Sequence, residues 1–184
     1  LQSPYYHLNK CDTLSFVLLG SRFPRFGLGY ITLDTRDHIK CIIECLKEIT
    51  LPVLCTLPNA DIEGDIIRNH LLDYESKYPN KIKCVENLGQ QGYLTAMSKT
   101  EFLLGNTSSG IIEAASFNKP VINLGDRQKG RTSGSNIIHT KINKFDIFEA
   151  IKKAQSMTKK TFENPYGDGN STERAVKILE KIIK

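Results

Sequence analysis

The chain has 184 residues, enough for one full hydrophobic core and few for two, so a single domain is the starting expectation. Its hydrophobic fraction of 40% and charged fraction of 24% are those of ordinary globular proteins and exclude the disordered class. The net charge is +5, but the basic residues are scattered, which argues against a nucleic-acid surface while permitting an anionic ligand.

Cysteines and apolar runs indicate the compartment. The five cysteines are an odd set without a CxxC pair, which favours a reduced, cytoplasmic protein. Cys41 and Cys45 lie four apart on a predicted helix, but no histidine sits beside them at ligand spacing, so no metal site is predicted and buried thiols are expected. No apolar run is long enough to span a bilayer, and residues 16–19 are too few for a signal-peptide core, so no membrane partner is expected.

Two parts of the chain differ in their pattern of apolar residues. Residues 1–29 read as an irregular lead-in, although residues 13–19 could form one more strand. From residue 30 to 184, short apolar runs alternate with segments of helical period, which is typical of βαβ units around a parallel sheet. The predicted strands are residues 30–33, 53–57, 82–85, 102–104 and 121–124, with a weaker one at 136–138.

Apolar positions three and four apart predict the helices between these strands. The apolar positions of three helices run from residue 39 to 49, from 62 to 71 and from 147 to 154, and two shorter helices are expected at 92–99 and 110–117. A last helix follows the turn-rich residues 164–170, where Asn170 and Glu173 are expected to form a reciprocal capping pair. Its apolar face comprises Val176, Leu179, Ile182 and Ile183. This alternation of strands and helices predicts a doubly wound, Rossmann-like α/β domain whose ligand lies outside the carboxyl ends of the strands.

The stretch from residue 102 to 116 is the most informative. An apolar strand leads into Thr107, Ser108 and Ser109, whose hydroxyl and N–H groups would favour an anion at the start of a helix. Glu113, one helical turn after Ser109, can accept hydrogen bonds from two neighbouring hydroxyls, as a ribose presents. The alternative is that Ser109 caps the helix and Glu113 complements its dipole.

The next strand ends in a glycine-rich loop that carries Arg127, Lys129 and Arg131. Cations on one loop, beside hydroxyls and a carboxylate on the neighbouring loop, predict a nucleoside diphosphate site, for which Arg is better suited than Lys. The alternative is a solvated basic turn.

The loop after the second strand and the four histidines carry weaker signals. Asn59, after the second strand, is expected to contact the ligand, and Asp61 to cap the following helix. No histidine is assigned to catalysis, because a lone histidine is usually structural: His7 and His70 look like ordinary surface or helix residues, His139 ends a strand, and only His38 lies near a carboxyl-end loop.

The motifs resemble the hydrolysing UDP-N-acetylglucosamine 2-epimerases of sialic-acid pathways. The matching segments, in the family's order and spacing, are residues 58–61, 105–113, 120–131 and 164–169. The resemblance implies the carboxyl half of a two-domain, GT-B-like enzyme that converts UDP-N-acetylglucosamine and water to N-acetylmannosamine and UDP. It places the diphosphate on Thr107 and Ser108, the ribose on Glu113 and a phosphate on Arg127.

The resemblance also implies limits. The family's acidic proton-transfer residues belong mainly to an amino-terminal domain, so this chain is expected to be inactive alone and its catalytic residues are left unassigned. Asp34 stands about where the family has a functional histidine. No metal or redox cofactor is implied, and a homodimer would fit. The open alternatives are a GT-B glycosyltransferase half and a non-catalytic UDP-sugar binding module, and the identity of the UDP-sugar also stays open.

Overall fold

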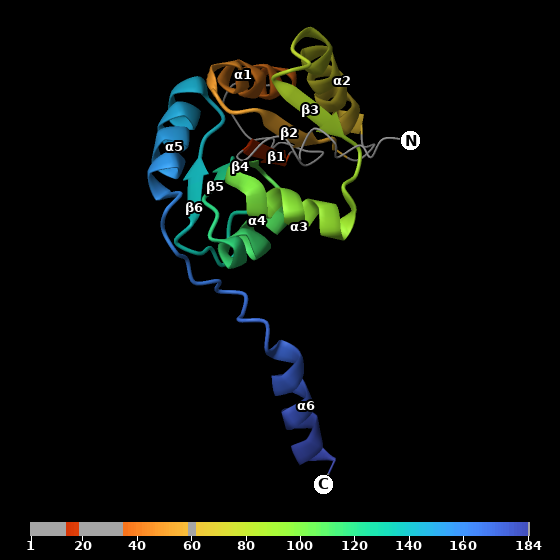
Figure 1. Ribbon diagram of the computed structural model, residues 1–184, viewed down its shortest axis with the longest axis vertical. Coiled ribbons are helices and arrows are strands. Elements are labelled where there is room, and N and C mark those ends of the chain that lie inside the picture. The colour runs from red at the N-terminus through yellow and green to blue at the C-terminus, as the bar shows by residue number, and fades with distance from the viewer. Residues whose placement is uncertain (1–13, 19–34, 59–61, 184) are drawn as a thin grey trace, which may run out of the picture.

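A six-stranded sheet in the order β3-β2-β1-β4-β5-β6 forms the centre of the molecule (Figure 1). The computed structural model describes residues 14–18, 35–58 and 62–183. Its strands are β1 (Leu14–Leu18), β2 (Val53–Thr56), β3 (Ile82–Val85), β4 (Thr100–Gly105), β5 (Val121–Leu124) and β6 (Ile137–Thr140). Every neighbouring pair runs parallel, so the doubly wound, Rossmann-like fold is confirmed.

Helices cover both faces of the sheet. They are α1 (Thr35–Glu48), α2 (Ile62–Lys77), α3 (Gly89–Lys99), α4 (Ser108–Glu113), η2 (Ala114–Phe117), α5 (Lys144–Met157) and α6 (Ser171–Ile182). One apolar cluster joins α1, α2 and α5 to the sheet, a second joins α3 and η2 to it, and α4 contacts η2 and β5. The result is a three-layer α/β/α arrangement in which α3 and α4 lie on the same face.

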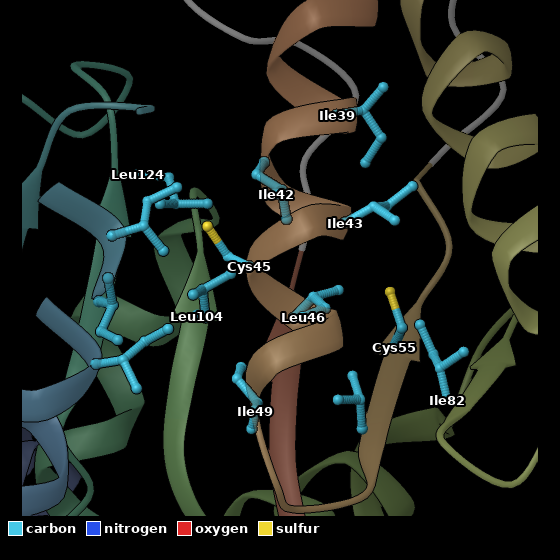
Figure 2. Close-up of a cluster of buried hydrophobic side chains, with 14 of the residues drawn as sticks. Ile39, Ile42, Ile43, Cys45, Leu46, Ile49, Cys55, Ile82, Leu104 and Leu124 are labelled. Carbon is cyan, nitrogen blue, oxygen red and sulfur yellow. The ribbon is translucent and has the colours of Figure 1, made fainter. Parts of the chain in front are cut away.

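The larger cluster is organised by α1 (Figure 2). Ile42, Cys45 and Leu46 are fully buried, and the picture shows them between Leu104 on one side and Cys55 on the other. Burial of each large aliphatic side chain stabilises the fold by about 1.5–3 kcal/mol. Burial also raises the pKa of the Cys45 thiol to about 12, so this cysteine is a protonated packing group.

The first strand of the sheet corrects the predicted boundary. Residues 14–18, placed within the lead-in with a strand only as an option, form β1 at the centre of the sheet between β2 and β4. The sheet therefore begins before residue 30. A central parallel strand needs only a short apolar run, which carries little periodicity to detect. The strand predicted at residues 30–33 lies outside the described residues.

The remaining strand predictions are confirmed, with ends displaced by no more than two residues. All predicted helices are present, although α3 begins three residues early and the helix predicted at 110–117 is α4 continued by η2. The capping pair predicted at α6 is wrong. Asn170 is the N-cap residue, as predicted, but it has φ −97° and ψ 18° rather than extended backbone, and its side chain makes no capping bond. Asp168 instead accepts from the Asn170 N–H and pairs with Arg174.

Helix α6 stands away from the rest of the molecule (Figure 1). None of its residues is buried. Its predicted apolar face is present but exposed to solvent: Val176 is 47%, Leu179 54% and Ile182 73% exposed. The α/β core therefore does not use this helix for its own packing.

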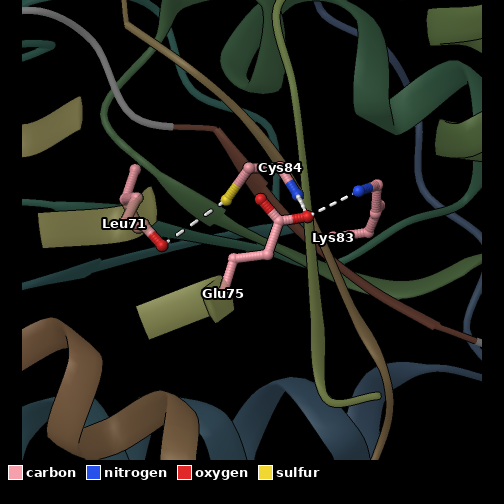
Figure 3. A network of polar contacts seen from close by, with 4 residues as sticks. All are labelled: Leu71, Glu75, Lys83 and Cys84. Carbon is pink, nitrogen blue, oxygen red and sulfur yellow. Dashed lines mark hydrogen bonds and ion pairs between the residues drawn. The ribbon is translucent and has the colours of Figure 1, made fainter. Parts of the chain in front are cut away.

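The open edge of the sheet is covered by a polar contact from α2 (Figure 3). Glu75 accepts from Lys83 Nζ at 2.7 Å and from the backbone N–H of Cys84 at 3.2 Å. The Cys84 thiol points to the carbonyl oxygen of Leu71. An edge strand presents unpaired backbone groups, and here Glu75 satisfies one of them.

Candidate functional site

The predicted hydroxyl residues follow β4 at the point where the strand order reverses, between β1 and β4. In open α/β sheets, ligands bind outside the carboxyl ends of the strands at this reversal. Gly105 and Asn106 end the strand in buried positions. Thr107, Ser108 and Ser109 come next and are half-buried, so their side chains lie at the end of the sheet and remain reachable from solvent.

The hydroxyls of Thr107 and Ser109 lie within hydrogen-bond distance of each other, and Ser109 also accepts from α3. Tyr93 Oη donates to Ser109 Oγ at 2.7 Å, and Ser109 Oγ lies 3.2 Å from Thr107 Oγ1. The N-cap of α4 is Thr107, whose side chain makes no capping bond, and Ser109 lies inside the helix. The alternative that Ser109 is a helix cap is therefore wrong.

Glu113 is the last residue of α4, which has only six residues. A carboxylate at the carboxyl end of a helix opposes the dipole, so the alternative that Glu113 complements it is also wrong. Its Oε2 atom is buried and has no hydrogen-bond partner within the part of the chain that the structure describes. Burial raises the pKa of this carboxyl above its ordinary value of 4.5. A buried acceptor without a donor is costly, and a ligand hydroxyl would satisfy it.

A glycine allows α4 to lie close to β5. A Cβ atom on Gly110 would be 3.3 Å from Val121 Cγ1, tighter than ordinary van der Waals contact. The close approach brings the hydroxyl row, which is Thr107, Ser108 and Ser109, next to β5, whose carboxyl end carries the basic loop of residues 125–131. This role of a glycine, close helix–strand packing beside a phosphate site, is known from nucleotide-binding turns.

The basic loop after β5 is held by a buried glutamine. Gln128 is 4% exposed, and its Nε2 donates to the carbonyl oxygen of Asn106 at 2.9 Å. The loop turns through Gly125 and Gly130, with φ of +67° and +85°, a region that side chains disfavour. Arg127 and Arg131 stay exposed, and neither forms an ion pair with any described residue. The Gln128 bond thus joins the basic loop to the residues after β4, and the arginines of the basic loop remain exposed to solvent.

A second polar chain supports the same loop from β6. Asn123 Nδ2 donates to the Gly125 carbonyl oxygen at 3.2 Å and to His139 Nδ1 at 3.1 Å. The other ring nitrogen of His139, Nε2, lies 3.2 Å from Ser133 Oγ. The group therefore orders the loop.

The segment of residues 164–169, predicted as a motif, contacts both α4 with η2 and the end of the basic loop. Asn164 Nδ2 donates to the Ile112 carbonyl oxygen at 2.9 Å and to Ser116 Oγ at 2.7 Å. Tyr166 Oη donates to the Thr132 carbonyl oxygen at 2.8 Å. The contacts span up to 52 residues of sequence and join α4, η2 and the basic loop to one support.

Sequence reasoning missed Tyr93 and Gln128. Gln128 carries a weak signal, an uncharged residue between cations, whereas nothing in the sequence marks Tyr93. Asn59 and Asp61 lie outside the described residues, as does Asp34. Within residues 14–18, 35–58 and 62–183, no three metal-ligating side chains gather to hold an ion. No helix in those ranges is both long and apolar enough to cross a membrane.

Comparison with known proteins adds three findings. A family model described as UDP-N-acetylglucosamine 2-epimerase matches residues 32–180. The UDP-N,N'-diacetylbacillosamine 2-epimerase (hydrolyzing) of Legionella pneumophila is 33% identical over 145 residues, which are 79% of this chain and 38% of that protein. The GDP/UDP-N,N'-diacetylbacillosamine 2-epimerase (hydrolyzing) of Campylobacter jejuni is 40% identical over 124 residues, 67% of this chain and 32% of that protein.

A solved structure agrees on the fold. The complex of MnaA from S. aureus with UDP superposes with a TM-score of 0.70 at 20% identity, over 100% of this chain and 49% of that chain. The present chain spans less than half the length of the proteins that it matches.

Proposed function

Because this chain belongs to the UDP-N-acetylglucosamine 2-epimerase family, we propose that it binds the UDP portion of a UDP-N-acetylhexosamine between the hydroxyl row and the basic loop. Thr107 and Ser108 donate to the diphosphate through their hydroxyls, and Ser109 donates through its backbone N–H at the start of the helix. Glu113 accepts from the ribose hydroxyls, and Arg127 and Arg131 neutralise the phosphate charge. Asn59 contributes from the loop after β2.

One observation carries this proposal: the bond from Gln128 to the Asn106 carbonyl oxygen at 2.9 Å. It joins the end of β4, next to the hydroxyls, to a loop whose Arg127 has no ion-pair partner in the described structure. The buried, unsatisfied Oε2 of Glu113 lies one helical turn from Ser109. Donors, cations and an acceptor at one end of the sheet match the groups of a nucleoside diphosphate.

The reaction proposed for the whole protein is the hydrolysing epimerisation of the family. The bond between the sugar C1 and the UDP oxygen breaks as the C2 proton is removed, giving a 2-acetamidoglucal, and water then adds with inversion at C2. Negative charge grows on the departing diphosphate, and hydroxyl donors and arginines that stabilise this charge lower the barrier. We place the proton-transfer groups outside this chain, so the chain alone binds UDP without turnover.

The competing assignment is half of a GT-B glycosyltransferase, with a non-catalytic UDP-sugar module as a further alternative. Neither is favoured, because the matched family and the two relatives above are epimerases by name. Product analysis on a full-length protein separates the classes. An epimerase releases UDP and N-acetylmannosamine, a transferase glycosylates an acceptor, and a binding module does neither.

Calorimetric titration of this chain with UDP, with ADP and inorganic phosphate as controls, tests the binding site directly. Binding of UDP with a much weaker response to ADP supports the proposal, since only the base and its contacts differ. Equal binding of UDP and ADP would reduce the site to a diphosphate site, and no binding by folded protein would overturn the assignment.

A further inference from the structure

Tyr93 lies beside the proposed site but belongs to none of the motifs that predicted it. It projects from α3, a helix that packs against β4 and η2, and its side chain is half-buried in the smaller apolar cluster. Its hydroxyl leaves that cluster to meet Ser109 Oγ at 2.7 Å. The contact crosses from one helix to another, so it relates the position of α3 to the hydroxyl row.

The hydroxyls of Tyr93, Ser109 and Thr107 lie in a chain. Tyr93 donates to Ser109 Oγ at 2.7 Å, and Ser109 Oγ lies 3.2 Å from Thr107 Oγ1, a contact in which either hydroxyl is able to donate. Acceptance from the phenol makes Ser109 the better donor of the two, so the direction from Ser109 to Thr107 is favoured and leaves the Thr107 proton for a group outside the chain. Hydrogen bonds arranged head to tail polarise one another, which strengthens the last donor.

Tyr93 is a dependable donor for this chain. Burial, with a further contribution from the negative charge of Glu113, raises the pKa of its hydroxyl to about 12. The phenol therefore keeps its proton over the physiological range. Glu113, the carboxylate proposed to hold the ribose, thus helps to keep the Tyr93 hydroxyl protonated.

We propose, on the premise of the UDP site above, that Tyr93 is a positioning residue that fixes the donor direction of Ser109 and Thr107 toward a diphosphate oxygen. Without the phenol, Ser109 and Thr107 can each donate to the other, and the outward donor is present only part of the time. Tyr93→Phe keeps the ring in the apolar cluster and removes only the hydroxyl.

The test compares UDP with uridine, because only UDP carries the acceptor that Thr107 addresses. Tyr93→Phe is expected to weaken UDP binding by about three- to tenfold, the effect of one neutral hydrogen bond, and to change uridine binding less than about twofold. Both ligands bind only folded protein, so the ratio of the two affinities is independent of any change in folding. Tyr74→Phe is the matched control, since Tyr74 is a buried tyrosine of α2 whose hydroxyl has no described partner.

Each outcome has a separate meaning. A selective loss for UDP in Tyr93→Phe, with Tyr74→Phe like the wild type, supports the inference. Wild-type affinity for UDP in Tyr93→Phe, or an equal loss for UDP and uridine, overturns it and leaves the UDP site standing. Failure of the wild-type chain to bind UDP overturns the proposed function and this inference with it.

Discussion

Glu113→Gln tests whether the buried carboxylate binds a ligand but lowers the stability of the free protein. The change removes the charge and preserves the shape of the side chain. Oε2 is buried with no donor among the described residues, and a charged carboxylate loses more on burial than the neutral amide that replaces it. Glu113 is only half-buried, so the difference is on the order of 1 kcal/mol. We expect the variant to be about 1 kcal/mol more stable at pH 7, a rise in Tm of about 2–4 °C for a domain of this size.

The gain should depend on pH with a defined sign. Burial raises the pKa of Glu113 in the folded state above the ordinary value of 4.5, so the folded protein holds this proton more tightly than the unfolded chain does. Below pH 4.5 the carboxyl is neutral in both states, and wild type and variant should unfold alike. As pH rises from 4.5 through the raised pKa, the wild type loses stability relative to the variant.

Thermal unfolding followed by circular dichroism between pH 4 and 8 measures this difference, and calorimetry measures UDP binding by the same proteins. Exchange of a charged acceptor for a neutral one should weaken UDP binding by about tenfold. A variant that is less stable than wild type at pH 7 would refute the claim that the carboxylate is unsatisfied. A more stable variant with unchanged UDP affinity would refute its role toward the ribose.

Three further changes separate binding from stability. Arg127→Ala should weaken UDP binding by about 1–3 kcal/mol, whereas Lys129→Ala on the same loop should cost less than about 0.5 kcal/mol; equal effects in calorimetry would argue against a directed phosphate contact. Glu75→Ala leaves the Cys84 N–H of the edge strand without its acceptor and should lower the free energy of unfolding in urea by about 1–3 kcal/mol, and an unchanged midpoint would contradict this. Deletion of residues 171–184 should leave Tm within about 1 °C, because α6 buries no residue, and a large fall would show that the core depends on it.

The fold was predictable to the extent that it depends on local pattern. Helices such as α1 and α5 repeat apolar residues at three and four positions, and strands such as β3 and β5 stand out as short β-branched runs between turns. The central strand β1 was only an option, because five residues carry too little periodicity. Its place between β2 and β4 is set by pairing with strands far along the chain.

The site was predictable in its composition but only partly in its contacts. The motifs identified Thr107, Ser109 and Glu113 as one group, and the structure places them on one short helix and its N-cap. The sequence left open whether Ser109 caps the helix, and its place inside α4, with Thr107 as the N-cap, decides against it. A cap can be proposed from spacing alone, whereas its absence depends on which distant side chain offers a better partner.

The sequence by itself determined the parallel α/β class, the order of the two ligand loops and the residue types that they carry, since periodicity, glycines and hydroxyl runs are local properties. Only the tertiary structure decided that Gln128 donates to the Asn106 carbonyl oxygen, that Glu113 Oε2 is buried without a donor among the described residues and that Tyr93 donates to Ser109. Each of these depends on burial or on a contact between elements. Burial and long-range contact arise when the sheet assembles, and no segment of the chain encodes them alone.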